Sequence, residues 1–177
     1  MKHLLRVFLV TFVFTFVFSN AWAELQMGQM PPGVELKDEL GGRLDGTPWS
    51  SDELRGKVYV LFYVDPDEAD LNNDASEALR KADFPSEQFQ SVAIINMAAT
   101  WLPNFAISSK LKKKQKAYPR TTYVRDYKKI VVEAWKIADD NSDVLAFDKQ
   151  GRLIFRKDGK LTPEEIQRLL QAVRENL

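Results

Sequence analysis

Apolar and polar residues alternate in segments whose spacing predicts strands and helices. Val58–Val64 is a nearly continuous apolar run and Phe89–Asn96 is a second, which predicts two strands that are covered on both faces of a sheet. Between them, Asp65–Ala82 repeats apolar residues at helical spacing. Asp65 suits the N-cap and Pro66 the first helical position, so we predict a helix that begins at this turn.

The rest of the chain supplies the other layers of one domain. The predicted elements are a short alternating segment over 34–37, a turn region over 41–46, a short turn capped by Ser50 or Ser51, a helix over 104–117, extended segments over 121–125 and 130–133, a hairpin formed by 142–147 and 152–156, and a last helix after Thr162. We find no linker and no internal repeat. The order β-α-β-α-β-β-α predicts a single α/β domain over residues 24–177, with a mixed sheet flanked by helices.

The first 23 residues have a different pattern. Lys2 and Arg6 precede the apolar stretch Val7–Phe18, and Ala21 and Ala23 are small residues placed as at a cleavage point. This layout is typical of a secretory signal peptide, and the apolar stretch is short for an uncleaved membrane anchor. We therefore predict a signal peptide over residues 1–23, cleavage after Ala23, and a periplasmic or secreted mature protein without membrane contact.

Charge and composition exclude several classes of function. The chain has 25 basic and 25 acidic residues, and residues 1–23 hold two of the basic ones and no acidic one, so the mature chain has a formal charge of −2. We expect no nucleic-acid binding, because a nucleic-acid-binding domain is usually basic. The chain has no cysteine, and its single histidine is His3. The mature protein therefore has no thiolate or imidazole for nucleophilic catalysis or zinc binding, and we expect no cofactor.

Several segments resemble the thioredoxin-like fold, specifically its exported thiol-reductase and peroxiredoxin branch. Leu54–Phe62 resembles the active-site strand and the turn before it. The other segments are Tyr118–Pro119, Val124–Asp126, Val131–Ile137, Phe147–Arg156 and Leu161–Ile166. More narrowly, the chain resembles the YtfJ family of exported thioredoxin-fold proteins without assigned biochemistry, through Leu54–Leu61, Ile95–Asn96, Tyr118–Pro119, Glu133–Trp135, Asp148–Arg152 and Lys157–Glu165. The resemblance implies a three-layer α/β sandwich. The acidic turn Asp65–Asp70 departs from the family's usual sequence at that place.

The resemblance also locates the positions of the redox site. It places the two redox cysteines of the fold at Glu68 and Leu71 and the facing cis-proline at Ser142. Thiol–disulfide exchange needs a thiolate, so thiol oxidoreductase and peroxidase activities are excluded for this chain.

We therefore interpret the protein as a non-redox binding or accessory module, whose partner is an unknown envelope protein or a small ligand. The expected contact surface is the vacated redox-site face, made of Asp65, Asp67, Glu68, Leu71, Trp101, Asn141 and Ser142.

Two alternative functions stay open. One is an enzyme of unknown substrate that uses carboxylates or lysine. The other is a structural protein that binds a divalent cation through Asp67, Asp70 and Asp74, which would share one face of the predicted helix. Acidic residues in a first helical turn also occur simply because they complement the helix dipole.

The helix predicted over Asn104–Ala117 ends in a run of lysines, which has two interpretations. The run consists of Lys110, Lys112, Lys113, Lys114 and Lys116. Cations at a helix C-terminus complement its dipole and are ordinarily solvated. The same residues could instead bind an anionic partner.

Overall fold

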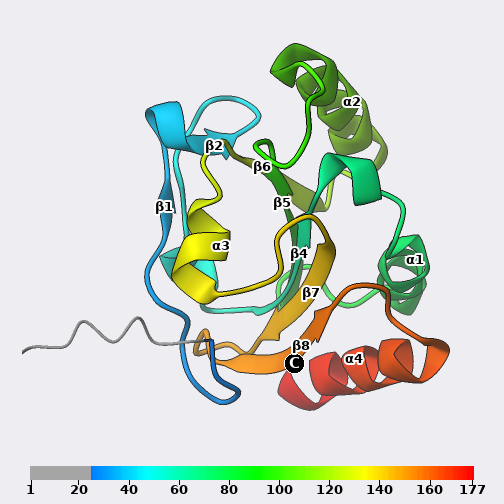
Figure 1. The fold of residues 1–177 in the computed structure, drawn as a ribbon. Helices are drawn as coiled ribbons and strands as arrows, with labels where there is room; N and C mark the ends of the chain where they lie inside the picture. Colours follow the sequence, from blue (N-terminus) through cyan, green and yellow to red (C-terminus); the bar gives the residue numbers. More distant parts are fainter. Residues whose placement is uncertain (1–24) are drawn as a thin grey trace, which may run out of the picture.

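The computed structural model describes residues 25–177, and its centre is a six-stranded mixed sheet (Figure 1). The strand order is β2-β6-β5-β4-β7-β8, in which β4, β5 and β6 are parallel and the other pairings are antiparallel. The strands are β2 (Gly41–Arg43), β4 (Val58–Val64), β5 (Phe89–Asn96), β6 (Thr121–Asp126), β7 (Ser142–Phe147) and β8 (Leu153–Asp158). A separate two-stranded sheet pairs β1 (Glu35–Leu36) with β3 (Trp49–Ser50).

Helices cover both faces of the main sheet, as the sequence predicts. In Figure 1, α1 (Asn73–Ala82), α2 (Asn104–Ala117) and α4 (Pro163–Asn176) lie on one side, and α3 (Ile130–Trp135) lies on the other with the N-terminal segment that carries β1. Side chains of a strand point alternately to its two faces. Phe62 of β4 accordingly joins the core under α1, α2 and α4, whereas Tyr63 joins the core under α3. Both layers need apolar side chains, which explains the continuous apolar run of β4.

Several predicted elements are confirmed to the residue. The bounds of β4, β5 and α2 agree with the prediction. Ser50 caps the 3-10 helix Ser51–Glu53 with its side chain. Thr162 caps α4 through a complete capping box with Glu165, so the local sequence sets the start of this helix.

The helix after β4 begins later than predicted. Pro66–Glu68 forms a separate 3-10 helix, which Asp65 caps by accepting a hydrogen bond from the Asp67 amide at 2.8 Å. A turn follows, and α1 starts only at Asn73. Asn72 interrupts the helix, because its buried side chain bonds to segments far along the chain. The prediction that Asp67, Asp70 and Asp74 share one helix face is therefore wrong.

Two other predictions are corrected. Ile130–Glu133, predicted as extended, belongs to helix α3, because the Asp126 carboxylate accepts hydrogen bonds from the amides of Ile130 and Val131 at 3.0 Å each and holds the start of the helix. The predicted turn region begins with strand β2, where Gly41 has φ 143° and a side-chain Cβ would lie 1.9 Å from the Arg125 carbonyl oxygen. Only glycine permits this close pairing with β6.

Candidate functional site

The turn after β4 is anchored by its buried first residue. Asp65 is only 4% exposed. Its amide donates a hydrogen bond to the Asn141 carbonyl oxygen at 2.8 Å, which joins the end of β4 to the start of β7. Burial raises the pKa of the Asp65 carboxyl, and the hydrogen bond from the Asp67 amide acts in the opposite direction. Asp65 therefore supports the turn from within and offers no exposed contact surface.

The three positions that the family resemblance predicts for the redox site do not form one cluster of reactive side chains. Glu68 is exposed, Leu71 is half-buried, and Ser142 is buried. No peptide bond between residues 25 and 177 is cis. The Ser142 amide donates to Oδ1 of Asn141 at 2.9 Å, a bond that a proline at this position could not make.

Asn72 links this turn to two other segments, a role that no motif in the sequence indicates. Its Nδ2 donates to the Ser142 carbonyl oxygen at 3.0 Å, to the Ser142 Oγ at 3.2 Å and to the Gly159 carbonyl oxygen at 3.1 Å. Its Oδ1 accepts from the Leu161 amide at 3.0 Å. These bonds fix the start of α1 against β7 and the loop before α4, and they occupy the Ser142 hydroxyl.

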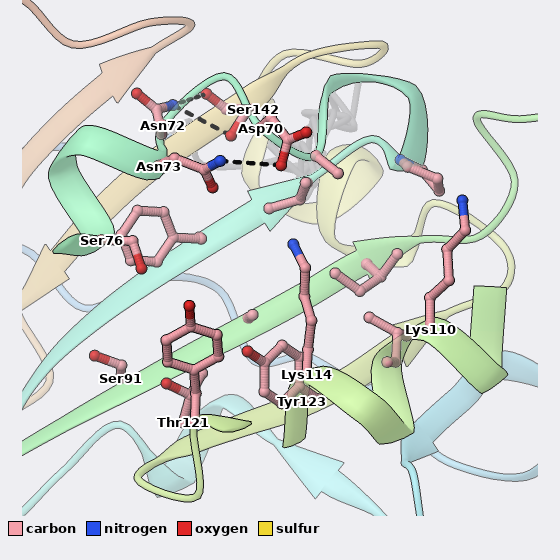
Figure 2. A pocket seen from close by; sticks show the side chains of 18 of the residues that line it. Asp70, Asn72, Asn73, Ser76, Ser91, Lys110, Lys114, Thr121, Tyr123 and Ser142 are labelled. Carbon is pink, nitrogen blue, oxygen red and sulfur yellow. Dashed lines mark hydrogen bonds between the residues drawn. The ribbon is translucent and has the colours of Figure 1, made fainter. Parts of the chain in front are cut away.

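A groove of about 470 Å³ opens beside this turn, between α1 and α2 (Figure 2). Its floor is mostly apolar and comes from β4, β5 and the inner side of α2. The apolar residues that these elements contribute are Phe62, Val64, Ala93, Ile95, Ile107 and Leu111. Such a volume with an apolar lining and a few polar groups is typical of a small-molecule site.

The two walls of the groove carry different charges. Asp70, in the turn before α1, and Glu77, on α1, line one side, and Lys110 and Lys114 of α2 line the other. Glu77 is paired with Arg80 at 2.6 Å, and Oδ1 of Asp70 accepts from Nδ2 of Asn73 at 3.0 Å. Within residues 25–177, neither lysine ammonium has an ion-pair or hydrogen-bond partner.

Tyr123 contributes a phenol to the groove from β6. Its side chain is largely buried and belongs to the core under the helices. Burial, with a smaller contribution from Tyr118, raises the pKa of Tyr123 to about 12. The Tyr123 hydroxyl therefore stays protonated at neutral pH and can donate a hydrogen bond.

The structure brings few of the residues predicted for the site to this groove. Of the seven residues predicted for the contact surface, Ser142 lines it. Asp67 and Glu68 are exposed on the turn, and Trp101 is 85% exposed outside the lining. From the predicted cation set only Asp70 lines the groove, and nowhere in residues 25–177 do three or more acidic side chains gather as metal ligands. Sequence reasoning singled out Lys110 and Lys114 as possible anion contacts, but not the apolar floor between them and α1.

A buried carboxyl lies on the opposite face of the sheet. Asp143 follows Ser142 on β7 and is fully buried, with Asp158 as its register partner on β8. Burial and, to a lesser extent, Asp158 raise the pKa of Asp143 to about 7, while the Arg156 charge lowers it. Because the folded protein retains this proton to a higher pH than the unfolded chain, the contribution of Asp143 to stability is greatest at acidic pH and falls as the pH rises from about 4 to about 7.

The layers, the strand order and the turn–helix after β4 define a thioredoxin-like protein. Two solved structures share this fold. The thioredoxin domain of a thiol-disulfide oxidoreductase from Bacteroides vulgatus aligns with a TM-score of 0.60 and 16% identity, over 84% of this chain and 97% of that one. The exposed lipoprotein thioredoxin Etrx1 from Streptococcus pneumoniae aligns with a TM-score of 0.54 and 17% identity, over 81% and 98% of the two chains.

The chain belongs to a bacterial family of proteins of unknown function, YtfJ_HI0045, whose profile matches residues 33–176. The uncharacterized protein YtfJ of Escherichia coli K12 is 29% identical over 163 residues, which cover 87% of this chain and 88% of that protein. An uncharacterized protein of Haemophilus influenzae is also 29% identical, over 88% and 89% of the two chains. The resemblances to the YtfJ family and to the thioredoxin-like fold are thereby confirmed.

The signal peptide predicted over residues 1–23 lies outside the described residues. Among residues 25–177, no helix is both long enough and apolar enough to cross a membrane.

Proposed function

We propose that this protein is a non-redox thioredoxin-like binding module that takes a small ligand in the groove between α1 and α2. The observation that carries the proposal is the position of the groove, which opens beside the turn where the fold otherwise places its redox site. Asp70 and Ser142 line the groove at that end. The cysteine-free sequence removes the chemistry of the site and leaves a concave surface of ligand size.

A bulky side chain placed in the groove tests this proposal. Ser76 is exposed on α1 and lines the groove, so Ser76→Trp fills space without disturbing the core. Gln167→Trp adds the same bulk at an exposed position of α4 outside the groove and is the matched control.

Native mass spectrometry of the protein, purified from the cells that produce it, measures the bound ligand. We expect a non-covalent adduct on the wild-type protein and on Gln167→Trp, and none on Ser76→Trp. An unliganded wild-type protein, or an adduct that persists in Ser76→Trp, would contradict the proposal.

We also propose that the protein acts outside the cytoplasm after removal of residues 1–23. The support is the positively charged start, the apolar stretch and the small residues before the cleavage point. The intact mass of the protein from the cell-envelope fraction should correspond to a chain that begins at Glu24. A mass that includes residues 1–23 would overturn this part of the proposal.

A further inference from the structure

The two lysines of the groove face it as a pair. Lys110 and Lys114 are four residues apart on α2, a spacing that places both side chains on one side of the helix. Figure 2 shows both side chains extending from α2 along the groove. Their ammonium groups have no partner among residues 25–177, so this wall carries uncompensated positive charge.

The floor beneath the lysines is apolar, and each of its side chains leaves only a small part of its surface exposed in the groove. Phe62, Ala93 and Ile95 come from the centre of the sheet, and Ile107 and Leu111 come from the first turns of α2. A ligand that covers this floor removes apolar surface from water, which favours binding in proportion to the area covered. The groove therefore combines an apolar floor with a positively charged wall.

We propose that the groove binds an amphipathic carboxylate, with its acyl chain on the floor and its head group between Lys110 and Lys114. This inference rests on the proposed function and names the ligand class of the same site. Charge-assisted hydrogen bonds from the two ammonium groups satisfy the carboxylate. The Tyr123 hydroxyl, protonated at neutral pH, is a neutral donor in the same groove.

The charges and the apolar floor of the groove disfavour other classes of ligand. Asp70 repels a second negative charge, whereas the charge of Glu77 is compensated by Arg80 at 2.6 Å. A polyanion therefore fits less well than a ligand with one anionic end. A cationic ligand would meet the two unpaired lysines. A small polar anion would leave the apolar floor uncovered.

The same helix supplies a matched control. Lys112 and Lys113 are exposed and do not line the groove. The variant Lys112→Gln/Lys113→Gln changes the net charge by as much as Lys110→Gln/Lys114→Gln, so a difference between the two separates a local contact from general electrostatic attraction.

The experiment is a calorimetric titration of the protein, as purified from the cells that produce it, with decanoate and, separately, with the uncharged alcohol decanol. We expect decanoate to bind the wild-type protein about tenfold more tightly than decanol. The double variant at Lys110 and Lys114 should weaken decanoate binding about tenfold, and the control double variant less than about threefold. Lys110→Arg/Lys114→Arg retains the charges and should restore most of the affinity.

The outcomes separate the ligand class from the proposed function. If decanol binds as tightly as decanoate and Ser76→Trp abolishes both, the groove is a binding site but the carboxylate assignment is overturned. If decanoate binds Ser76→Trp as tightly as it binds the wild-type protein, it binds outside the groove. That result would contradict both this inference and the groove as the binding site. Failure of the arginine variant to restore affinity would also overturn the role assigned to the two charges.

Discussion

Removal of the side chain of Asn72, the residue just before α1, should destabilise the protein more than removal of the exposed side chain next to it, Asn73. Asn72 is 6% exposed and makes four hydrogen bonds, to Ser142, Gly159 and Leu161. Asn72→Ala leaves the buried Leu161 amide and two carbonyl oxygens without this partner. A buried polar group that loses its partner costs about 1–3 kcal/mol. The costs are not additive in a shared network, so we expect the free energy of unfolding to fall by about 3 kcal/mol.

The assay is urea denaturation followed by circular dichroism, with Asn73→Ala as the control. Asn73 is exposed and donates one hydrogen bond, to Asp70 at 3.0 Å. Its removal should change the free energy of unfolding by less than about 0.5 kcal/mol. If Asn72→Ala also stays within about 0.5 kcal/mol of wild type, the network around Asn72 does not hold the start of α1, and our account of where that helix begins is refuted.

Two other substitutions test buried polar groups. Asp143→Asn removes a carboxyl whose pKa is raised from 3.8 to about 7. A pKa shift of this size changes the free energy of unfolding by at most about 4 kcal/mol. Allowing for screening, the wild-type free energy of unfolding should fall by about 2 kcal/mol more than that of Asp143→Asn between pH 5 and pH 8, and equal pH slopes in urea denaturation would contradict this. Trp135→Phe loses the bond from Nε1 to the Pro32 carbonyl oxygen at 2.8 Å and should cost about 1–2 kcal/mol. Trp101→Phe, at an exposed position, should lower the free energy of unfolding by less than about 0.5 kcal/mol. Similar losses in the two tryptophan variants would show that the Trp135 hydrogen bond does not stabilise the protein.

Elements whose signals are local could be predicted from the sequence. Val58–Val64 is apolar because both its faces are covered, and Thr162 and Glu165 cap α4 within one turn of the chain. The start of α3 could not be predicted in this way, because Asp126 reaches across a turn to hold it. The start of α1 depends on Asn72 bonding to Ser142, seventy residues later.

The candidate site illustrates the same limit. The sequence indicated a vacated redox position and a basic helix end as separate features. The groove exists because α1 and α2 follow successive parallel strands on one face of the sheet and leave part of β4 and β5 between them. Lys110 and Phe62 are far apart along the chain, and only the packing of the helices shows that they line one surface.

The bonds of Asn72 have a consequence for the conditions under which the groove keeps its shape. A disulfide at this turn would open or close with the reduction potential of the surroundings. The side-chain amide of Asn72 instead holds the start of α1 to β7 through hydrogen bonds that neither a reductant nor a thiol oxidant breaks. The end of the groove formed by Asp70 and Ser142 therefore keeps the same geometry whether the surroundings are reducing or oxidising.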